Sequence, residues 1–423
     1  MITGVEADDP GERHGRPLLL RILGIALLVV AVAVGVVLAI IPRSVEDELA
    51  AGEIESIGDA SFYVPPSPLT SAAPGTVVRT ERLNSAPEGS IGWRVLYHST
   101  DAFGRDILTS GVVVTPDTPA PAGGRVVVGW AHPTTGAVAR CAPSNGMTPF
   151  LSIEAIGPLL NAGYAIAAAD YPGLGVEGPS SYLIGASEGH SVLDSVRAAR
   201  SLPEVGSGST TVFWGHSQGG QAALFAGQLA AEYAPEMDVK AVAVAAPAAD
   251  LGALLKADID DISGVTIGSY AFSGFQSAYG ARYPGMSLDQ ILTPEGVAAT
   301  APMSQLCLLG QNAELHNYAR PLIGKYLRAD PETVEPWATL LQENTPAATP
   351  ADLPLFVAQG GKDTLVVPSA TEKFVGTQCA AGRPVDFKLY PDDDHGTVAL
   401  TASGDVASYF QQILAGEAPT STC

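Results

Sequence analysis

The sequence predicts an α/β protein with a doubly wound, mostly parallel sheet and a cap insertion between strands six and seven. Two observations support this prediction. Continuous apolar runs, typical of strands buried on both faces, alternate with stretches of helical periodicity. The alternation stops near residue 250 and resumes at residue 353, which indicates an inserted segment.

The expected elements follow one another in a regular order. The first three strand-like runs are 75–83, 92–100 and 106–116, and the last two alternate enough to suggest an antiparallel start. Core strands are then expected at 125–131, 165–170, 210–214 and 241–247, with helices at 190–202 and 221–234. After the insertion come a strand at 353–360, a helix near 370–376, a strand at 385–390 and a closing helix at 403–416.

The composition is that of a folded chain with a large core. Of 423 residues, 46% are apolar and only 16% are charged, which suits one large α/β domain with an insertion, or two domains. The net charge of −22 disfavours nucleic acids and anionic lipid head groups as partners, since both attract clustered Lys and Arg.

The amino-terminal segment carries a targeting signal. Twenty consecutive residues without a charge, Ile22–Ile41, are long enough to span a bilayer, and three arginines precede them. Residues 1–41 are therefore expected to be a cytoplasmic tail and a membrane anchor that leaves the rest of the chain outside. A cleaved signal peptide, which would release the protein, is the alternative. Residues 42–75, with the proline cluster VPPSPL, are expected to be a linker.

The core is expected to comprise 76–249 and 352–423, and the cap 250–351. The aromatic and aliphatic residues of the cap suggest either an apolar acyl tunnel or simply the cap's own core.

The hexapeptide Gly215–Gly220 (GHSQGG) lies between a β-branched run and an alanine-rich helical stretch. This strand–tight turn–helix context is that of a nucleophile elbow with Ser217 at its apex. A second match to the same pattern, Gly185–Gly189, follows a polar loop with no strand before it. We expect its serine, Ser187, to cap the next helix.

A serine nucleophile needs a histidine base and a carboxylate that orients it. Of seven histidines only His316 and His395 follow Ser217. His395 directly follows the last strand and is the predicted base, whereas His316 falls inside the cap. Asp363 follows the strand at 353–360 and is the predicted acid.

The rival carboxylates for the acid, Asp392, Asp393 and Asp394, lie too near His395 in sequence to address its far nitrogen. They are expected to form a solvated turn. His216, next to the nucleophile, is expected to point away from it.

Acyl transfer also needs two donors for the oxyanion. The backbone N–H of Gln218, directly after the nucleophile, is expected to supply one. The loop after the strand at 125–131 is expected to supply the other through the amides of Thr134 and Thr135. An ordinary Pro-Thr turn is the alternative for this loop.

Four cysteines suit an exported chain with two disulfides, although the sequence leaves three pairings open. The cysteines are Cys141, Cys307, Cys379 and Cys423. Neither Cys-x-x-Cys nor His-Glu-x-x-His occurs, so no zinc site is expected, and the chemistry requires no organic cofactor.

Five motifs in this order resemble those of the secretory lipases, a family of the α/β-hydrolase superfamily that includes fungal lipase A types and actinobacterial homologues. The motifs are HPTTG at 132–136, DYPGLG at 170–175, GHSQGG at the elbow, GGKDTLV at 360–366 and DDDHG at 392–396. The resemblance covers about residues 60 to 423. It implies an α/β-hydrolase fold with Ser217 as nucleophile, Asp363 as acid and His395 as base. It also implies the disulfides Cys141–Cys307 and Cys379–Cys423.

The predicted function is that of an extracytoplasmic serine ester hydrolase, a triacylglycerol lipase or carboxylesterase, acting on an ester or lipid through an acyl-enzyme. A peptidase or an acyltransferase on the same scaffold is one alternative, because the elbow does not identify the acyl acceptor. A hydrolase-like binding module without activity is the other. The presence of Ser217, Asp363 and His395 in the right order argues against it.

Overall fold

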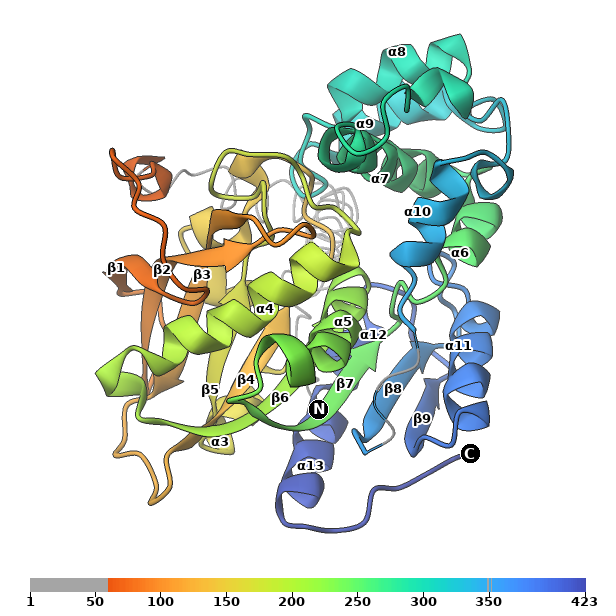
Figure 1. Cartoon of the computed structure of the whole chain (residues 1–423). Helices are drawn as coiled ribbons and strands as arrows, with labels where there is room; N and C mark the ends of the chain where they lie inside the picture. Colours follow the sequence, from red (N-terminus) through yellow and green to blue (C-terminus); the bar gives the residue numbers. More distant parts are fainter. Residues whose placement is uncertain (1–59, 348–349, 351) are drawn as a thin grey trace, which may run out of the picture. The chain divides into compact units, whose positions relative to one another are not determined.

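A nine-stranded mixed sheet forms the centre of the computed structural model (Figure 1). The structure describes residues 60–347, 350 and 352–423. The strand order is β1-β2-β3-β5-β4-β6-β7-β8-β9. The strands are β1 (Val77–Leu83), β2 (Ser90–Thr100), β3 (Asp106–Pro116), β4 (Arg125–Ala131), β5 (Ala165–Ala169), β6 (Ser207–His216), β7 (Asp238–Ala245), β8 (Leu355–Gly360) and β9 (Val385–Tyr390).

The sheet begins antiparallel and continues parallel. Strands β1, β2 and β3 pair antiparallel with one another, and β3 pairs antiparallel with β5. All pairs from β5 through β4, β6, β7 and β8 to β9 are parallel. Most of β2 and β3 is buried on both faces, although their alternating sequences are typical of strands with one solvated face.

Helices cover both faces of the sheet, as a doubly wound fold requires. One face packs on α4 (Gly185–Arg200), α5 (Gln218–Tyr233) and α11 (Pro368–Ala380) through residues such as Val192, Ala222 and Phe374. The other face packs on α3 (Ile156–Asn161), α12 (Val398–Thr401) and α13 (Ser403–Leu414) through Leu159, Val398 and Phe410. The fold predicted from the sequence is thus present.

Between β7 and β8 the chain forms a separate group of helices, here called the cap (residues 250–347). Its helices are α6 (Leu251–Asp258), α7 (Ile262–Tyr279), α8 (Pro294–Met303), α9 (Asn312–Ala319) and α10 (Trp337–Glu343). They enclose a hydrophobic core that includes Phe272, Phe275 and Trp337. The cap therefore follows the seventh strand, not the sixth as predicted, because all three amino-terminal runs join the sheet.

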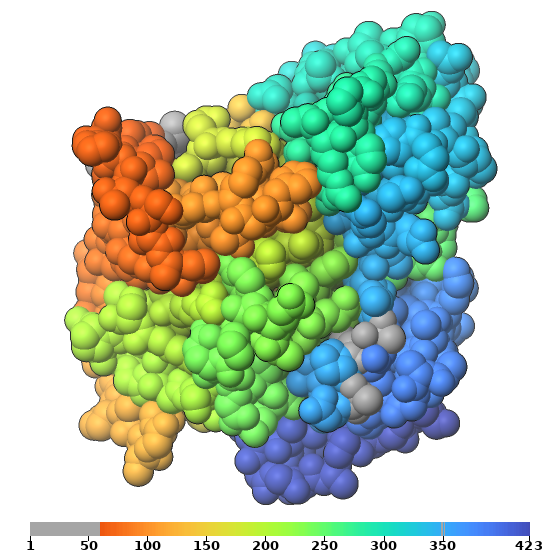
Figure 2. All heavy atoms as spheres, viewed as in Figure 1, coloured from red at the N-terminus to blue at the C-terminus, as the bar shows by residue number. Residues whose placement is uncertain are grey.

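The cap lies beyond the carboxyl ends of the parallel strands, above β6, β7 and β8 in Figure 1. In the space-filling view its teal and light-blue atoms meet the orange and yellow-green surface of the core (Figure 2). Such an edge is where open α/β sheets place their ligand sites.

Two disulfides fasten segments that are distant in sequence. Cys141, at the end of the 3-10 helix η2 (Ala139–Cys141), is bonded to Cys307 of the cap, 166 residues later. Cys379, in α11, is bonded to Cys423 in the carboxyl-terminal tail. These are the two pairs that the family resemblance implies.

The folded body begins before residue 76. Residues Phe62 and Tyr63, in the 3-10 helix η1 (Ala60–Tyr63), are buried against Leu96 and Leu108 of the sheet. The end of the predicted linker therefore packs on the core. The predicted anchor at 22–41 lies outside the described residues. Among the residues that are described, no helix is long and apolar enough to span a membrane.

Candidate active site

Ser217 occupies a sharp turn between β6 and α5. Its backbone has φ 58° and ψ −121°, a conformation that is costly for a residue with a side chain. The neighbouring glycines permit the turn. A Cβ at Gly215 would lie 2.1 Å from the carbonyl oxygen of Gly219, and a Cβ at Gly219 would lie 2.0 Å from that of Ala131. Only glycine fits at either position, so the sequence around Ser217 is what this turn requires.

The three residues predicted as a triad lie in one hydrogen-bonded row. The Nε2 atom of His395 is 3.0 Å from Ser217 Oγ, and its Nδ1 atom is 2.8 Å from Asp363 Oδ2. The other carboxylate oxygen of Asp363 accepts the backbone N–H groups of Leu365 and Val366, at 2.9 and 2.8 Å. Asp363 is therefore held in place by its own loop while it faces the histidine.

The surroundings of His395 favour the neutral form of its imidazole near pH 7. Burial lowers its pKa below the ordinary value, the hydrogen bond to Asp363 opposes this change, and the nearby charge of His216 adds to the lowering. A neutral imidazole can take a proton at Nε2 only when Nδ1 carries one, and Asp363 stabilises that tautomer.

His216 packs against the triad. Its Nδ1 atom is 2.8 Å from Glu154 Oε1, and its ring centroid is 4.8 Å from that of His395. Sequence analysis did not find Glu154. It lies 62 residues upstream of His216, outside any recognisable motif.

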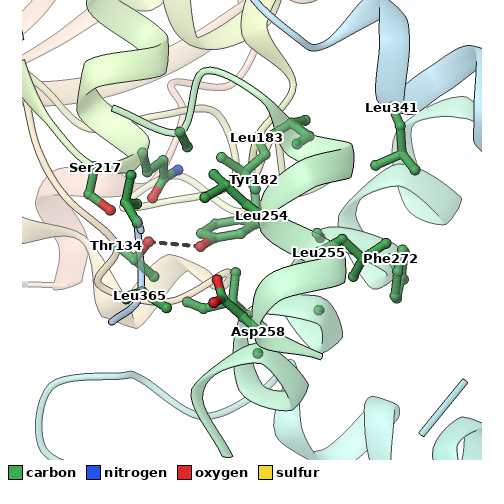
Figure 3. Close-up of a pocket in the computed structure, with 18 of the residues that line it drawn as sticks. Thr134, Tyr182, Leu183, Ser217, Leu254, Leu255, Asp258, Phe272, Leu341 and Leu365 are labelled. Carbon is green, nitrogen blue, oxygen red and sulfur yellow. Dashed lines mark hydrogen bonds between the residues drawn. The ribbon is translucent and has the colours of Figure 1, made fainter. Parts of the chain in front are cut away.

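Two of the three predicted oxyanion residues, Thr134 and Gln218, line the same pocket as Ser217. Figure 3 shows Thr134 and Ser217 on its wall. Among the described residues, the backbone N–H groups of Thr134, Thr135 and Gln218 have no hydrogen-bond acceptor. Thr135 does not line the pocket, and its carbonyl oxygen accepts the N–H of Leu308 at 2.9 Å. The geometry therefore favours Thr134 over Thr135.

The loop that holds Thr134 is anchored by a side-chain hydrogen bond. Its Oγ1 atom lies 2.7 Å from the hydroxyl of Tyr182, which lines the pocket as well.

The rival residues lie elsewhere. His316 is in α9 of the cap. The side chain of Asp392 pairs with Lys362 at 2.9 Å. Asp393 accepts a hydrogen bond from the hydroxyl group of Thr401, and Asp394 accepts the backbone N–H groups of Gly396 and Thr397.

Ser187 does not cap a helix, so that expectation is wrong. It lies inside the first turn of α4, whose N-cap is Ile184, and its Oγ atom accepts the N–H of Ala102 at 2.8 Å. The helix begins earlier than its apolar periodicity indicates.

The pocket beside Ser217 has mostly apolar walls contributed by the cap. These include Leu254, Leu255, Ile267, Phe272, Phe275 and Leu341. Phe272 and Phe275 also belong to the core of the cap, so the interpretation of these residues as cap core is confirmed. The acyl tunnel stays a prediction. Across the described part of the chain, no group of three or more His, Cys, Asp or Glu side chains is arranged to hold a metal ion.

A buried carboxyl group holds the side chain of Gln218, the residue after Ser217. Glu188 in α4 is fully buried, and its Oε1 atom accepts Gln218 Nε2 at 2.7 Å and the N–H of Leu183 at 2.9 Å. Burial raises its pKa well above the ordinary value. Sequence analysis missed Glu188, although it lies within the second Gly-x-Ser-x-Gly match.

Known proteins resemble this chain over much of its length. A family model described as secretory lipase matches residues 141–422. A "probable inactive lipase" from Mycobacterium tuberculosis is 29% identical over 211 residues, which are 46% of this chain and 46% of that protein. The chain thus spans less than half the length of that relative.

Longer matches exist at lower identity. Lipase A from Moesziomyces aphidis is 23% identical over 401 residues, covering 86% of this chain and 82% of that protein. The X-ray structure of Candida antarctica lipase A superposes with a TM-score of 0.72 at 19% identity, over 87% of this chain and 89% of that one. This likeness shows a shared α/β-hydrolase fold.

Proposed function

The chain belongs to the secretory lipase family, and we propose that it is a serine carboxylic-ester hydrolase with Ser217 as its nucleophile. Membership of this family, together with the shared fold, supports a hydrolase of the lipase and esterase type. The observation that supports Ser217 as the nucleophile is the continuous row of hydrogen bonds from Ser217 through His395 to Asp363.

In the first half of the reaction Ser217 Oγ attacks the ester carbonyl carbon. Its proton passes to His395 Nε2, and the carbonyl oxygen becomes an oxyanion. The unpaired N–H groups of Gln218 and Thr134 are our candidates for donors to that oxyanion. The tetrahedral species collapses, the alcohol leaves with the proton from His395, and the acyl group stays on Ser217.

In the second half a water molecule takes the place of the alcohol. His395 removes one proton from it as it attacks the acyl carbon, and a second tetrahedral oxyanion forms. When this species collapses, Ser217 Oγ leaves and recovers the proton from His395. The products are a carboxylic acid and the free enzyme. Throughout, Asp363 stays ionised and stabilises the imidazolium.

The apolar pocket walls favour an ester whose acyl group is a hydrocarbon chain. Leucine, isoleucine and phenylalanine side chains from the cap surround the space next to Ser217. Burial of an acyl chain against them would be favourable at about 0.8 kcal/mol per methylene. A triacylglycerol or a simpler carboxylic ester fits this description.

We also propose that catalysis takes place outside the cytoplasm. Membership of a secretory family and two disulfides both favour an exported chain. The protein is then either anchored through residues 22–41 or released after cleavage of that segment.

Active-site labelling tests the proposal. A fluorophosphonate probe should label the wild-type protein and fail to label Ser217→Ala. Ser187→Ala is the matched control, because Ser187 belongs to the second Gly-x-Ser-x-Gly pattern, its Oγ atom accepts the N–H of Ala102, and it does not line the pocket beside Ser217. The wild type should also hydrolyse p-nitrophenyl esters. A protein that is neither labelled nor active would be a binding module. The test matters because the relative from Mycobacterium tuberculosis is named a probable inactive lipase. Labelling with transfer to an alcohol or amine instead of water would indicate an acyltransferase.

A further inference from the structure

The pocket beside Ser217 contains one carboxyl group that the reaction does not use. Asp258 is the last residue of α6 and only 7% of its surface is exposed. It lines the pocket, and in Figure 3 its carboxyl group points from the cap into the space that Ser217, Thr134 and Tyr182 also face.

No described residue satisfies this carboxyl group. Its Oδ1 atom is enclosed and has no hydrogen-bond partner. The charged groups near it are Asp261, which caps the start of α7, and Asp363 of the triad; both repel a negative charge. The nearest lysine in sequence, Lys256, is exposed and paired with Glu332.

An unpaired buried carboxyl group is costly. Leaving a buried polar group without a hydrogen bond costs on the order of the whole desolvation penalty. The other cap residues that line the pocket, such as Leu254, Leu255 and Phe272, are apolar, so a leucine at this position would avoid that cost. A polar group in the substrate would supply the hydrogen bond that the protein lacks.

We propose that Asp258 is a specificity-determining residue that selects esters whose acyl chain carries a hydroxyl group. The hydroxyl group would pair with the Asp258 carboxyl group while the ester carbonyl lies at Ser217. This inference rests on the proposed function, because it assigns the acyl chain to this pocket.

The protonation state favours a hydroxyl group over a cation. Burial, together with the charges of Asp261 and Asp363, raises the pKa of Asp258 to about 8. At pH 7 the neutral carboxyl group both donates and accepts, as a hydroxyl group does. An ammonium group would have to be desolvated among aliphatic side chains with only a neutral partner.

The expected discrimination is substantial. A hydrophobic pocket alone rejects an added hydroxyl group weakly, whereas a site with a buried hydrogen-bonding group penalises substrates that leave it unpaired. The comparison therefore uses p-nitrophenyl octanoate and a series of its monohydroxy derivatives, with the hydroxyl group moved along the chain. In the wild type, one position should raise kcat/KM at least about tenfold over the unsubstituted ester.

Two variants isolate the carboxyl group. Asp258→Leu should abolish the hydroxyl preference, so that the ratio of kcat/KM for the hydroxylated ester to kcat/KM for the unsubstituted ester falls to about one. Asp258→Asn keeps a donor and an acceptor and should retain most of the preference. Lys256→Leu, an exposed change in the same helix, should leave the ratio unchanged. An equal ratio in wild type and Asp258→Leu, or a preference for ammonium-bearing esters, would overturn the proposal.

Binding separates this inference from the proposed function. Methyl octanoate and the methyl ester of the preferred hydroxyoctanoate would be titrated calorimetrically into Ser217→Ala protein with Asp258 intact or replaced by Leu. Tighter binding of the hydroxylated ester that depends on Asp258 supports the inference even if no turnover or labelling occurs. Equal binding overturns it even if Ser217 proves to be the nucleophile.

Discussion

The rings of His216 and His395 lie 4.8 Å apart, centroid to centroid, at an interplanar angle of 41°. The residue beside Ser217 thus contacts the proposed base directly, and the electrostatic interaction with His216 lowers the pKa of His395. Replacement by an uncharged residue removes this effect, while Glu154, whose charge raises the pKa, remains.

We therefore predict that His216→Gln raises the pKa of His395. Because His395 must be neutral to act as a base, the acidic limb of the kcat/KM–pH profile should move to higher pH. Hydrolysis of a p-nitrophenyl ester between pH 4.5 and 8 measures the limb. A limb that stays in place or moves to lower pH would show that the two rings are not electrostatically coupled.

The carboxylate of Asp363 should be indispensable for turnover. Asp363→Asn would place an amide opposite His395 Nδ1 and favour the wrong tautomer, so kcat should fall by about 10⁴. Any residual activity should show an acidic limb at lower pH, because the hydrogen bond and charge of Asp363 raise the pKa of His395.

Asp392→Asn is the matched control for this change. Asp392 is an exposed acid in the turn before His395, and among the described residues its side chain pairs with Lys362. Its replacement should leave kcat within about twofold, since an exposed ion pair contributes little. A comparable loss in both variants would mean that the negative charge of the turn matters more than the contact with His395.

The sequence was sufficient to predict that Ser217, Asp363 and His395 would lie close together, because each belongs to a local pattern at the end of a strand. Ser217 lies in a glycine-rich turn, and Asp363 and His395 follow successive strands. Parallel strands bring their carboxyl ends to the same edge of the sheet, so order along the chain predicted that they would meet. The structure brings them together as expected.

The supporting residues could not be predicted in this way. Glu154 bonds to His216, 62 residues later, and Glu188 bonds to Gln218, 30 residues later. Contacts over such distances produce no periodic pattern in the sequence. Asp258 belongs to a cap whose sequence shows neither strand nor helix periodicity clearly. Ser187 was misplaced because α4 begins at Gly185, before its apolar pattern becomes visible.

Glu188 should act as a positioning residue for Gln218, one of the proposed donors to the oxyanion. Glu188→Ala would leave Gln218 Nε2 and the Leu183 N–H buried without an acceptor, which should lower stability by about 1–3 kcal/mol and reduce kcat more than it changes KM. Glu188→Gln preserves the accepting oxygen and should restore kcat. Failure of the glutamine to restore it would point to a charged role for Glu188.

Glu188→Gln, compared with the wild type, also tests the protonation state of Glu188. Its pKa is raised in the folded protein, so folding keeps a proton that the unfolded chain loses above about pH 4.3. This group should therefore make the wild type progressively less stable as the pH rises from about 4.3 towards the folded pKa. Urea unfolding of Glu188→Gln between pH 5 and 9 should show a smaller decline than wild type.

Asp258 should impose a pH limit on binding of apolar esters. Below about pH 8 its carboxyl group is neutral, and above that pH it ionises. The groups that face it, Asp261, Asp363 and Tyr182, provide no compensating cation. The KM for p-nitrophenyl octanoate should therefore rise from pH 7 to 9.5 in the wild type and stay level in Asp258→Asn. Parallel rises in both proteins would assign the effect to another group.

The disulfide Cys141–Cys307 should contribute to activity as well as stability. It bonds the segment after β4 to the cap, and the next residue, Leu308, donates its N–H to the carbonyl oxygen of Thr135. Replacing both cysteines by serine should lower the free energy of unfolding by about 2–5 kcal/mol. It should also reduce kcat, because the loop of Thr134 and Thr135 loses a fixed support.

The second disulfide distinguishes these two effects. Cys379–Cys423 closes a shorter loop of 44 residues between α11 and the carboxyl-terminal tail, and neither cysteine lines the pocket. Its double serine variant should lose stability without a loss of kcat at a temperature where both variants remain folded. Thermal unfolding and kcat measured together on the two variants decide the matter. Equal effects on kcat would show that Cys141–Cys307 acts only through the overall stability of the fold.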